Sequence, residues 1–284
     1  MTDVFLNGKF IAADEAKVSV LDRGFVFGDG VYEVIPVYEG HCFKLKSHLE
    51  RLQNSLDESR IVNPYSEKHW ETVLNKLINL HLGGDQVLYI QVTRGVAARD
   101  HVFPENTNPT VFVMSNLMQV VPVKYKKNGI SAISLKDSRW QRCNIKSTSL
   151  LPNCLLKQQA KDAGAEEALL ISDGYLTEGS TSNAYAVIDG VIYTAPKSGK
   201  ILAGITREVV ISLASKAGIR LIEEPVAEFK LTDVDELWTS SSTKEVLPIT
   251  RLNGVKVGEG IPGPVWQKID ALYQHAKAEE RNDG

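Results

Sequence analysis

The sequence predicts an α+β protein of two domains. Strand-like runs come in hairpin groups, and helix-forming segments stand between the groups rather than alternating with single strands. The polar, lysine-bearing segment "PVKYKKNG" separates two such sets, and 284 residues are enough for two ordinary domains. We therefore expect a small domain over 1–120, a linker over 121–127 and a larger domain over 128–284.

The strands of the first domain are predicted from β-prone runs around short turns. "VFLNGKFI" reads as a hairpin that turns at Asn7-Gly8, and "GVYEVIPVYEGHCFKL" as one that turns at Glu39-Gly40. "QVLYIQVTRG" and "PTVFVMSN" are further strand candidates. Together they predict an antiparallel sheet.

Two amphipathic helices are expected between these strands. "SHLERLQNSLDESR" places Leu49, Leu52 and Leu56 on one stripe, with Ser47 as the N-cap. "SEKHWETVLNKLINLHLGG" is the second helix, ended by Gly83-Gly84. Its inward face is predicted to comprise Trp70, Val73, Leu74, Leu77 and Ile78.

The second domain shows the same mixture. "GISAISLKD", "EEALLIS" and "DELWTSSST" are strand candidates, and "SNAYAVIDGVIYTA" is a hairpin that turns at Asp189-Gly190. Helices are expected after Lys146, over "GITREVVISLASKAG" and over "PVWQKIDALYQHAKAEE".

Composition excludes several function classes. A formal net charge of -3 with no basic stripe argues against nucleic acid as a partner, and six scattered histidines argue against a metal site. Cys42, Cys143 and Cys154 show no CxxC spacing, which favours reduced thiols and a cytoplasmic location. "MTDVFLNGKF" does not look like a secretion signal, and no apolar run reaches the ~18 residues of a membrane span, so no membrane association is expected.

Lys146 is the most unusual candidate for chemistry. It follows Ile145 in "RCNIKSTSLL" and precedes the hydroxyl cluster Ser147, Thr148 and Ser149, which resembles a helix N-cap. The side chain either snorkels, with its ammonium in water, or is held in a pocket where a lowered pKa frees the amine to react. Buried lysines are scarce, so these residues alone favour snorkelling.

Three features could bind an anion. Thr206 falls in the first turn of the "GITREVV" helix, where amide groups and the helix dipole favour negative charge, although a cap is the commoner role. The hydroxyl run from Thr239 to Ser242 suits either a turn or phosphate oxygens. Arg51 has a surface ion pair with Glu50 or Asp57 as its ordinary alternative.

The remaining candidates are also ambiguous. Glu178 in "LTEGSTSN" is either solvated or placed to hold a proton on a heteroaromatic nitrogen. Tyr32 follows the glycine-rich stretch "DRGFVFGDG", which matches neither a Walker A nor a Rossmann pattern, and packing is its simplest role. Arg99 and His101 would face the same side of an extended backbone and suit a carboxylate, or belong to an exposed loop.

Taken together, these segments resemble one family. "FLNGKF", "DRGFVFGDGVYE", "HLERL", "VTRG", "RCNIKS", "LTEGSTSN", "GITREVV" and "SSSTKEVLPI" occur in the order found in fold-type IV pyridoxal-phosphate aminotransferases. "GDGVYEV" and "ARDHVF" are most similar to the D-amino-acid transaminases of that family. The resemblance implies a small N-terminal α/β sandwich domain and a larger C-terminal pseudobarrel domain.

The resemblance also implies a role for each candidate. Lys146 would be the Schiff-base lysine and proton shuttle of pyridoxal 5′-phosphate, Glu178 would pair with the pyridine nitrogen, and Leu202 would pack against the ring. The phosphate would be bound by Arg51, Ile205, Thr206, Ser241 and Ser242.

Substrate binding is implied in the same way. A trap for the substrate carboxylate would consist of Tyr32 together with Arg99 and His101, the latter two lent by a neighbouring subunit. The active unit would then be at least a homodimer. Its partners would be small D-amino acids and 2-oxo acids.

The reaction implied is a ping-pong transamination, in which D-alanine and 2-oxoglutarate give pyruvate and D-glutamate. The alternatives on the same fold are an L-branched-chain aminotransferase, an aminodeoxychorismate lyase and an (R)-amine transaminase. A protein that binds the cofactor without catalysis is a further alternative, against which the intact Lys146 and Glu178 argue.

Overall fold

A computed structural model of the chain describes residues 3–80 and 83–282, and the chain divides into two compact units. The first contains Met1–Gln119, Ile145–Leu150 and Arg281–Gly284, and the second contains Val120–Asn144 and Leu151–Glu280. This division differs from our expectation because 145–150, which carries Lys146, groups with the first unit. The expected linker 121–127 is also largely helical, since helix α4 spans Val123–Asn128.

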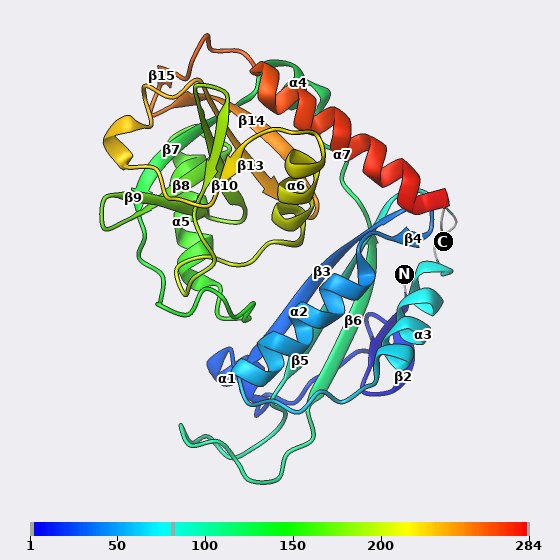
Figure 1. Ribbon diagram of the computed structural model, residues 1–284. Coiled ribbons are helices and arrows are strands. Elements are labelled where there is room, and N and C mark those ends of the chain that lie inside the picture. The colour runs from blue at the N-terminus through cyan, green and yellow to red at the C-terminus, as the bar shows by residue number, and fades with distance from the viewer. Residues whose placement is uncertain (1–2, 81–82, 283–284) are drawn as a thin grey trace. The chain divides into compact units, whose positions relative to one another are not determined.

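The first unit is built on a six-stranded antiparallel sheet in the order β2-β1-β6-β5-β3-β4 (Figure 1). The expected turns at Asn7-Gly8 and Glu39-Gly40 are present, and all four residues have positive φ, as tight hairpins require. The strands are β1 (Asp3–Leu6), β2 (Lys9–Ala12), β3 (Gly30–Tyr38), β4 (His41–Cys42), β5 (Gln86–Thr93) and β6 (Thr110–Leu117).

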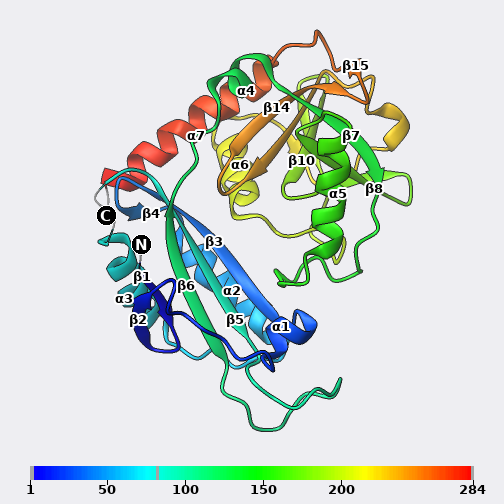
Figure 2. The same ribbon diagram turned by 180° about the vertical axis from the view of Figure 1, so that it is seen from behind.

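Two helices, α2 (Leu45–Glu58) and α3 (Glu67–Ile78), pack on one face of this sheet, and Figure 2 shows β5 and β6 from the other side. The predicted leucine stripe and the predicted inward face of α3 are buried in this core. The prediction of Ser47 as N-cap is wrong. Helix α2 already begins at Leu45, after Lys44 in a left-handed conformation with φ 57°.

A short helix, α1 (Arg23–Phe27), lies inside the glycine-rich stretch that precedes β3. Asp22 caps its start by accepting a hydrogen bond from the amide of Gly24, and Gly28 ends it with φ 68°. The chain then enters β3 directly.

In the second unit, six strands close into a barrel. The sheet runs β12-β11-β10-β13-β14-β7-β8-β9, and β9 pairs back with β10 through Glu178 and Asn183. The strands are β7 (Ile130–Lys136), β8 (Glu167–Ser172), β9 (Tyr175–Gly179), β10 (Asn183–Ile188), β11 (Val191–Thr194), β12 (Leu221–Ile222), β13 (Glu236–Ser241), β14 (Glu245–Leu252) and β15 (Val255–Lys256).

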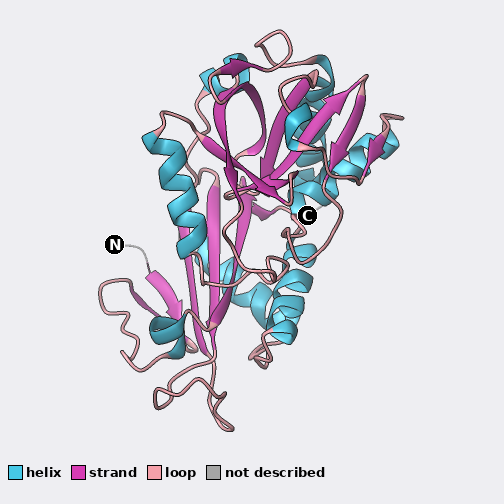
Figure 3. Ribbon diagram, turned by 90° about the vertical axis from the view of Figure 1, so that its left-hand side faces the viewer, coloured by secondary structure: helices cyan, strands magenta, loops and turns pink. Residues whose placement is uncertain are grey.

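Alternation along the barrel strands separates two sets of buried side chains. On β8, Leu169 and Ile171 belong to the central core, whereas Ala168 and Leu170 pack against α5 (Leu151–Asp162). Helices α6 (Ile205–Lys216) and α7 (Pro264–Asn282) cover another part of the outer surface through Val210 and Ile269. A 3₁₀ turn, η1, spans Glu228–Lys230. Figure 3 distinguishes these strands in magenta from the helices in cyan.

None of the helices within residues 3–80 and 83–282 combines the length and apolar character that crossing a membrane would demand.

Candidate active site

Lys146 is fixed through its backbone. Its carbonyl oxygen accepts a hydrogen bond from the amide of Tyr32 (2.9 Å), and its own amide donates to the hydroxyl of Ser55 on α2 (3.2 Å). The Nζ atom lies 4.1 Å from the centre of the Tyr32 ring, and the preceding Ile145 is buried in the core of the first unit. The lysine is therefore held against β3 and α2, and its amine lies over an aromatic face.

The hydroxyl cluster after Lys146 does not cap helix α5, so the N-cap interpretation is wrong. Thr148 Oγ1 donates to the carbonyl of Gly28 (2.9 Å) and Ser149 Oγ donates to the same carbonyl (3.1 Å). The amide of Thr148 bonds to the carbonyl of Gly30 (2.9 Å). These contacts join the lysine segment to the turn that precedes β3.

A buried ionic cluster lies between β3 and α2. Arg51 donates from Nε to Oε1 of Glu33 and from Nη2 to Oε2, each at 2.8 Å. His48 Nδ1 lies 2.9 Å from the same Oε2 atom. Glu33 is fully buried, and alternation along β3 directs it to the opposite face from Tyr32. The surface ion pair considered for Arg51 is therefore wrong, because its partner is Glu33.

Electrostatics in this cluster favour an ionised carboxylate. Burial by itself raises the pKa of Glu33, but Arg51 and His48 outweigh burial and hold that pKa well below its usual range. Burial lowers the pKa of His48, against the opposing effect of Glu33. Sequence reasoning missed both Glu33 and His48, although the spacing of His48 and Arg51 on one helical face was a usable signal.

Arg99 and His101 meet on one aromatic ring. Arg99 Cζ lies 5.2 Å from the centre of the Phe27 ring, and the imidazole of His101 lies 5.5 Å from it. Both side chains are exposed and lie at bends outside the described strands, which matches the exposed loop that we considered and not the extended backbone. Their shared neighbour nevertheless brings them to the same place.

In the second unit, Glu178 is the centre of a buried network. Its Oε1 atom accepts from Arg139 Nη1 (2.5 Å), and its Oε2 atom accepts from Asn183 Nδ2 and from the amide of Leu202 (3.1 Å each). Arg139 is held in turn by Asp137, through Nε to Oδ1 (3.0 Å) and Nη2 to Oδ2 (2.8 Å). Arg139 stands in the "SRWQRC" stretch, but it carries no motif that identifies this role.

Burial raises the pKa of the Glu178 carboxyl to about 7, although Arg139 and the Leu202 amide favour ionisation. The pKa of Arg139 is shifted upward by Asp137 and Glu178 despite its own burial, so it stays cationic. Glu178 is thus a carboxyl that can gain or lose a proton near neutral pH.

Strand register places other candidates of the second unit around Glu178. Asn183 pairs with Glu178 on one side and with Ser240 on the other, and Ser241 follows in β13. The Asn183 amide also donates to the carbonyl of Leu202 (2.8 Å). Helix α6 begins shortly after Leu202, and its first two residues, Ile205 and Thr206, are buried. Ser242 follows Ser241 in the turn to β14, where Ser241 Oγ accepts from the Lys244 amide (3.3 Å).

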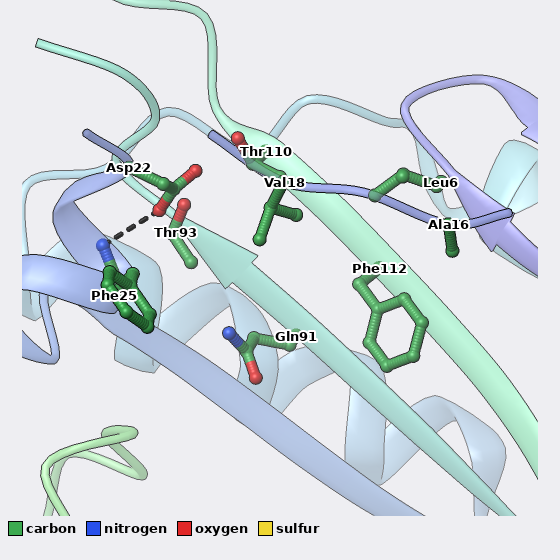
Figure 4. A pocket seen from close by; sticks show the side chains of 10 residues that line it. Leu6, Ala16, Val18, Asp22, Phe25, Gln91, Thr93, Thr110 and Phe112 are labelled. Atoms are coloured by element: carbon green, nitrogen blue, oxygen red, sulfur yellow. Dashed lines mark hydrogen bonds between the residues drawn. The ribbon is translucent and has the colours of Figure 1, made fainter. Parts of the chain in front are cut away.

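A separate pocket of about 360 Å³ lies in the first unit (Figure 4). It contains Gln91 and Thr93, which alternate along β5 with core residues, so it opens on the face of the sheet away from α2 and α3. The predicted site residues are not among those that line it. The full lining is Leu6, Ala16, Val18, Asp22, Gly24, Phe25, Gln91, Thr93, Thr110 and Phe112.

Comparison with known proteins identifies the family. The model of the family "Amino-transferase class IV" matches residues 30–252. The chain belongs to the class IV aminotransferases. This class IV aminotransferase is 41% identical over 273 residues to the D-alanine aminotransferase of Bacillus licheniformis, with 96% of each chain covered. It is 41% identical to that of Staphylococcus aureus (strain MSSA476), with 96% of this chain and 97% of the relative covered.

Solved structures agree on the fold. The branched-chain aminotransferase of the archaeon Thermoproteus uzoniensis, solved with norvaline, superposes with a TM-score of 0.88 at 26% identity, covering 99% of this chain and 96% of that one. The predicted α+β fold of type IV, with its pseudobarrel, is confirmed, as is the predicted family.

The residues present fit the chemistry of pyridoxal 5′-phosphate. An aldehyde needs an amine, which Lys146 offers, and a pyridine nitrogen needs a proton donor or counter-ion, which Glu178 offers at a pKa of about 7. A phosphate dianion needs a guanidinium, amides or hydroxyls. The second unit offers the amides at the start of α6 and the hydroxyls of Ser241 and Ser242, and the first unit offers the guanidinium of Arg51 on α2.

Proposed function

We propose that this class IV aminotransferase moves the amino group of D-alanine to 2-oxoglutarate in a ping-pong reaction, with pyridoxal 5′-phosphate as cofactor. The observation that carries the proposal is 41% identity over nearly the full chain to proteins named D-alanine aminotransferase. The predicted enzyme class, a pyridoxal-phosphate-dependent D-amino-acid transaminase, is confirmed by these relatives.

The bound cofactor supplies an electron sink for the charge that develops when the substrate Cα–H bond breaks. Lys146 supplies the amine that would hold the cofactor covalently and that, once the substrate amine has displaced it, would move the proton at the substrate Cα. The two hydrogen bonds at the Lys146 backbone support this role, because they fix the chain and leave motion to the side chain alone.

Glu178 is proposed to hold the proton at the pyridine nitrogen. Three N–H donors orient its carboxyl group, and a pKa of about 7 suits a proton shared with a weakly basic nitrogen. Leu202, whose amide is one of these donors, is proposed to pack against the ring.

The phosphate is proposed to be bound by Arg51, by the amides of Ile205 and Thr206 and by the hydroxyls of Ser241 and Ser242. Glu33 supports the role of Arg51, since a two-point ion pair fixes the plane of the guanidinium. The glycine N-cap of α6 supports the role of the helix start, because no side chain there occupies the first amides.

The substrate carboxylate is proposed to bind Tyr32 together with Arg99 and His101 of a neighbouring subunit in a homodimer. A guanidinium and an imidazole on one ring are suited to grip a carboxylate. Handedness would follow from the side on which this trap holds the carboxylate.

Branched-chain transamination is the second candidate, because the structure from Thermoproteus uzoniensis has that activity in its name. Its lower identity, 26% against 41%, favours the D-amino-acid reaction. The test is an amino-donor panel of D-alanine, L-alanine, D-leucine, L-leucine and aminodeoxychorismate with purified holoenzyme. We expect pyruvate from D-alanine and bleaching of the cofactor colour. Preferential turnover of L-leucine would instead favour the branched-chain reaction, and turnover of aminodeoxychorismate the lyase.

A further inference from the structure

One partly buried carboxylate and two buried guanidinium groups form a cluster at the base of the loop after β5. Asp29 Oδ2 accepts from Arg23 Nε (2.7 Å) and from Arg94 Nε (2.8 Å), and Arg94 Nη2 reaches Asp29 Oδ1 (3.0 Å). Arg23 and Arg94 are only 4% and 6% exposed. Burial of two cations on one anion is costly unless their other N–H groups find partners.

Those partners are backbone carbonyls in two different segments. Arg94 donates to two carbonyls just after α2, at 2.7 and 2.8 Å, and so ties the cluster to that helix. Arg23 instead reaches the loop after β5, where its Nη1 donates to the carbonyl of Asp100 (2.5 Å) and lies 3.5 Å from that of Val102. These two residues flank His101, and Asp100 also separates it from Arg99.

Aromatic contacts hold the same loop. Arg94 Cζ lies 3.6 Å from the centre of the Phe103 ring. Arg23 Cζ lies 4.7 Å from the centre of the Phe27 ring, which is the ring that Arg99 and His101 also contact. The two guanidinium groups therefore reach the loop through its backbone and through the ring of Phe103, and Arg23 also lies against the Phe27 ring of α1.

We propose that Arg23, oriented by Asp29, is a positioning residue that fixes the loop 99–103 and thereby sets substrate affinity. The inference rests on the proposed role of Arg99 and His101 in binding the substrate carboxylate. Arg23 donates in two directions at once, from Nε to Asp29 and from Nη1 to the loop, which the single ammonium of a lysine cannot reproduce. Without Arg23, the side chains of Arg99 and His101 would sample many orientations. Substrate binding would then have to order them, which lowers the affinity.

The test compares Arg23→Gln and Arg23→Lys holoenzymes with wild type. We expect the KM for D-alanine to rise about tenfold in Arg23→Gln and less in Arg23→Lys, with kcat close to wild type. Amide hydrogen exchange in peptides covering 96–104 should become faster, which reports on the loop without reference to turnover. The matched control is Arg220→Gln, which removes an exposed arginine of the second unit and should alter neither quantity.

Several outcomes would overturn the inference: unchanged loop exchange in a folded Arg23→Gln protein, or a fall in kcat with no change in KM. A raised KM without faster loop exchange would also overturn it, because the effect would not pass through the loop. If Arg23→Gln does not fold, the same criteria apply to Arg23→Lys. Arg99→Ala measured in parallel distinguishes failure of the proposed carboxylate trap from failure of the positioning role of Arg23. An unchanged KM there would refute the carboxylate trap, whereas a raised KM there with no effect at Arg23 would refute only the positioning role.

Discussion

At the scale of single residues, Glu178 illustrates how the fold tunes a side chain. A carboxyl group with three N–H donors would ordinarily be strongly acidic, yet burial raises its pKa to about 7. The result is a group whose proton can be held or released at physiological pH. The neighbouring Arg139 cannot play this part, because a guanidinium does not titrate in that range.

Arg99 carries the residue-scale prediction. Replacing Arg99 by alanine removes a charge-assisted contact to the substrate carboxylate, which we expect to weaken the apparent affinity for D-alanine by about 1.5–3 kcal/mol. The measurement is steady-state kinetics over a range of D-alanine concentrations. Arg99→Lys keeps the charge and should lose less. An Arg99→Ala enzyme that saturates like wild type would place the carboxylate site elsewhere.

At the scale of elements, Glu33 joins β3 to α2 through Arg51 and His48. Its pKa is held low in the folded protein, so its ionised form stabilises the fold above the ordinary range of a glutamate. That stabilisation is lost as the pH falls through the ordinary glutamate pKa toward the lower folded value. The link between these two elements should therefore weaken in acid.

Glu33→Gln tests this link. We expect the free energy of unfolding at neutral pH to fall by about 3–5 kcal/mol, because the buried Arg51 loses its counter-ion. Between about pH 5 and pH 3, the free energy of unfolding of the variant should decrease less steeply than that of wild type, since the titrating group is gone. Denaturant unfolding at several pH values measures both. Glu50→Gln removes an exposed carboxylate from α2, the helix that carries Arg51, and equal behaviour of the two variants would contradict the prediction.

Sequence patterns predicted elements well where burial follows a simple period. The leucine stripe of α2 and the inward face of α3 are confirmed because helical spacing alone decides which side chains are buried. Helix α1 was not predicted, since its five residues are too few to show a period, and its start depends on the cap at Asp22. The start of α2 was misplaced because Lys44 adopts a left-handed conformation that its identity does not suggest.

At the scale of the whole molecule, the candidate site residues come from segments far apart in the sequence. Lys146 groups with the first unit although most of its neighbours in sequence belong to the second. The family resemblance identified the residues expected to contact the cofactor, since they lie in short motifs. It did not identify the residues that hold them, such as Glu33 beside Arg51 and Arg139 beside Glu178, because those partners are known only once the strands and helices are placed.

The proposed homodimer makes a prediction of its own. If Arg99 and His101 serve the neighbouring subunit, mixing Lys146→Ala and Arg99→Ala chains should restore activity, because one site of each mixed dimer is then intact. At low D-alanine, random exchange of subunits should give roughly a quarter of the wild-type activity per chain. Co-expression with two affinity tags and purification through both isolates the mixed dimer alone, which should show roughly half of the wild-type activity per chain. Activity equal to the simple average of the two variants would show that each subunit completes its own site.

The most direct test of the central claim is to locate the covalent link to the cofactor. Holoenzyme is reduced with borohydride, digested and analysed by peptide mass spectrometry, with Lys146→Ala as the control that should bind cofactor yet neither be labelled nor turn over. We predict a single pyridoxyl group, on Lys146. A label on another lysine, or none in a protein that retains its colour and activity, would contradict the assignment of the active site.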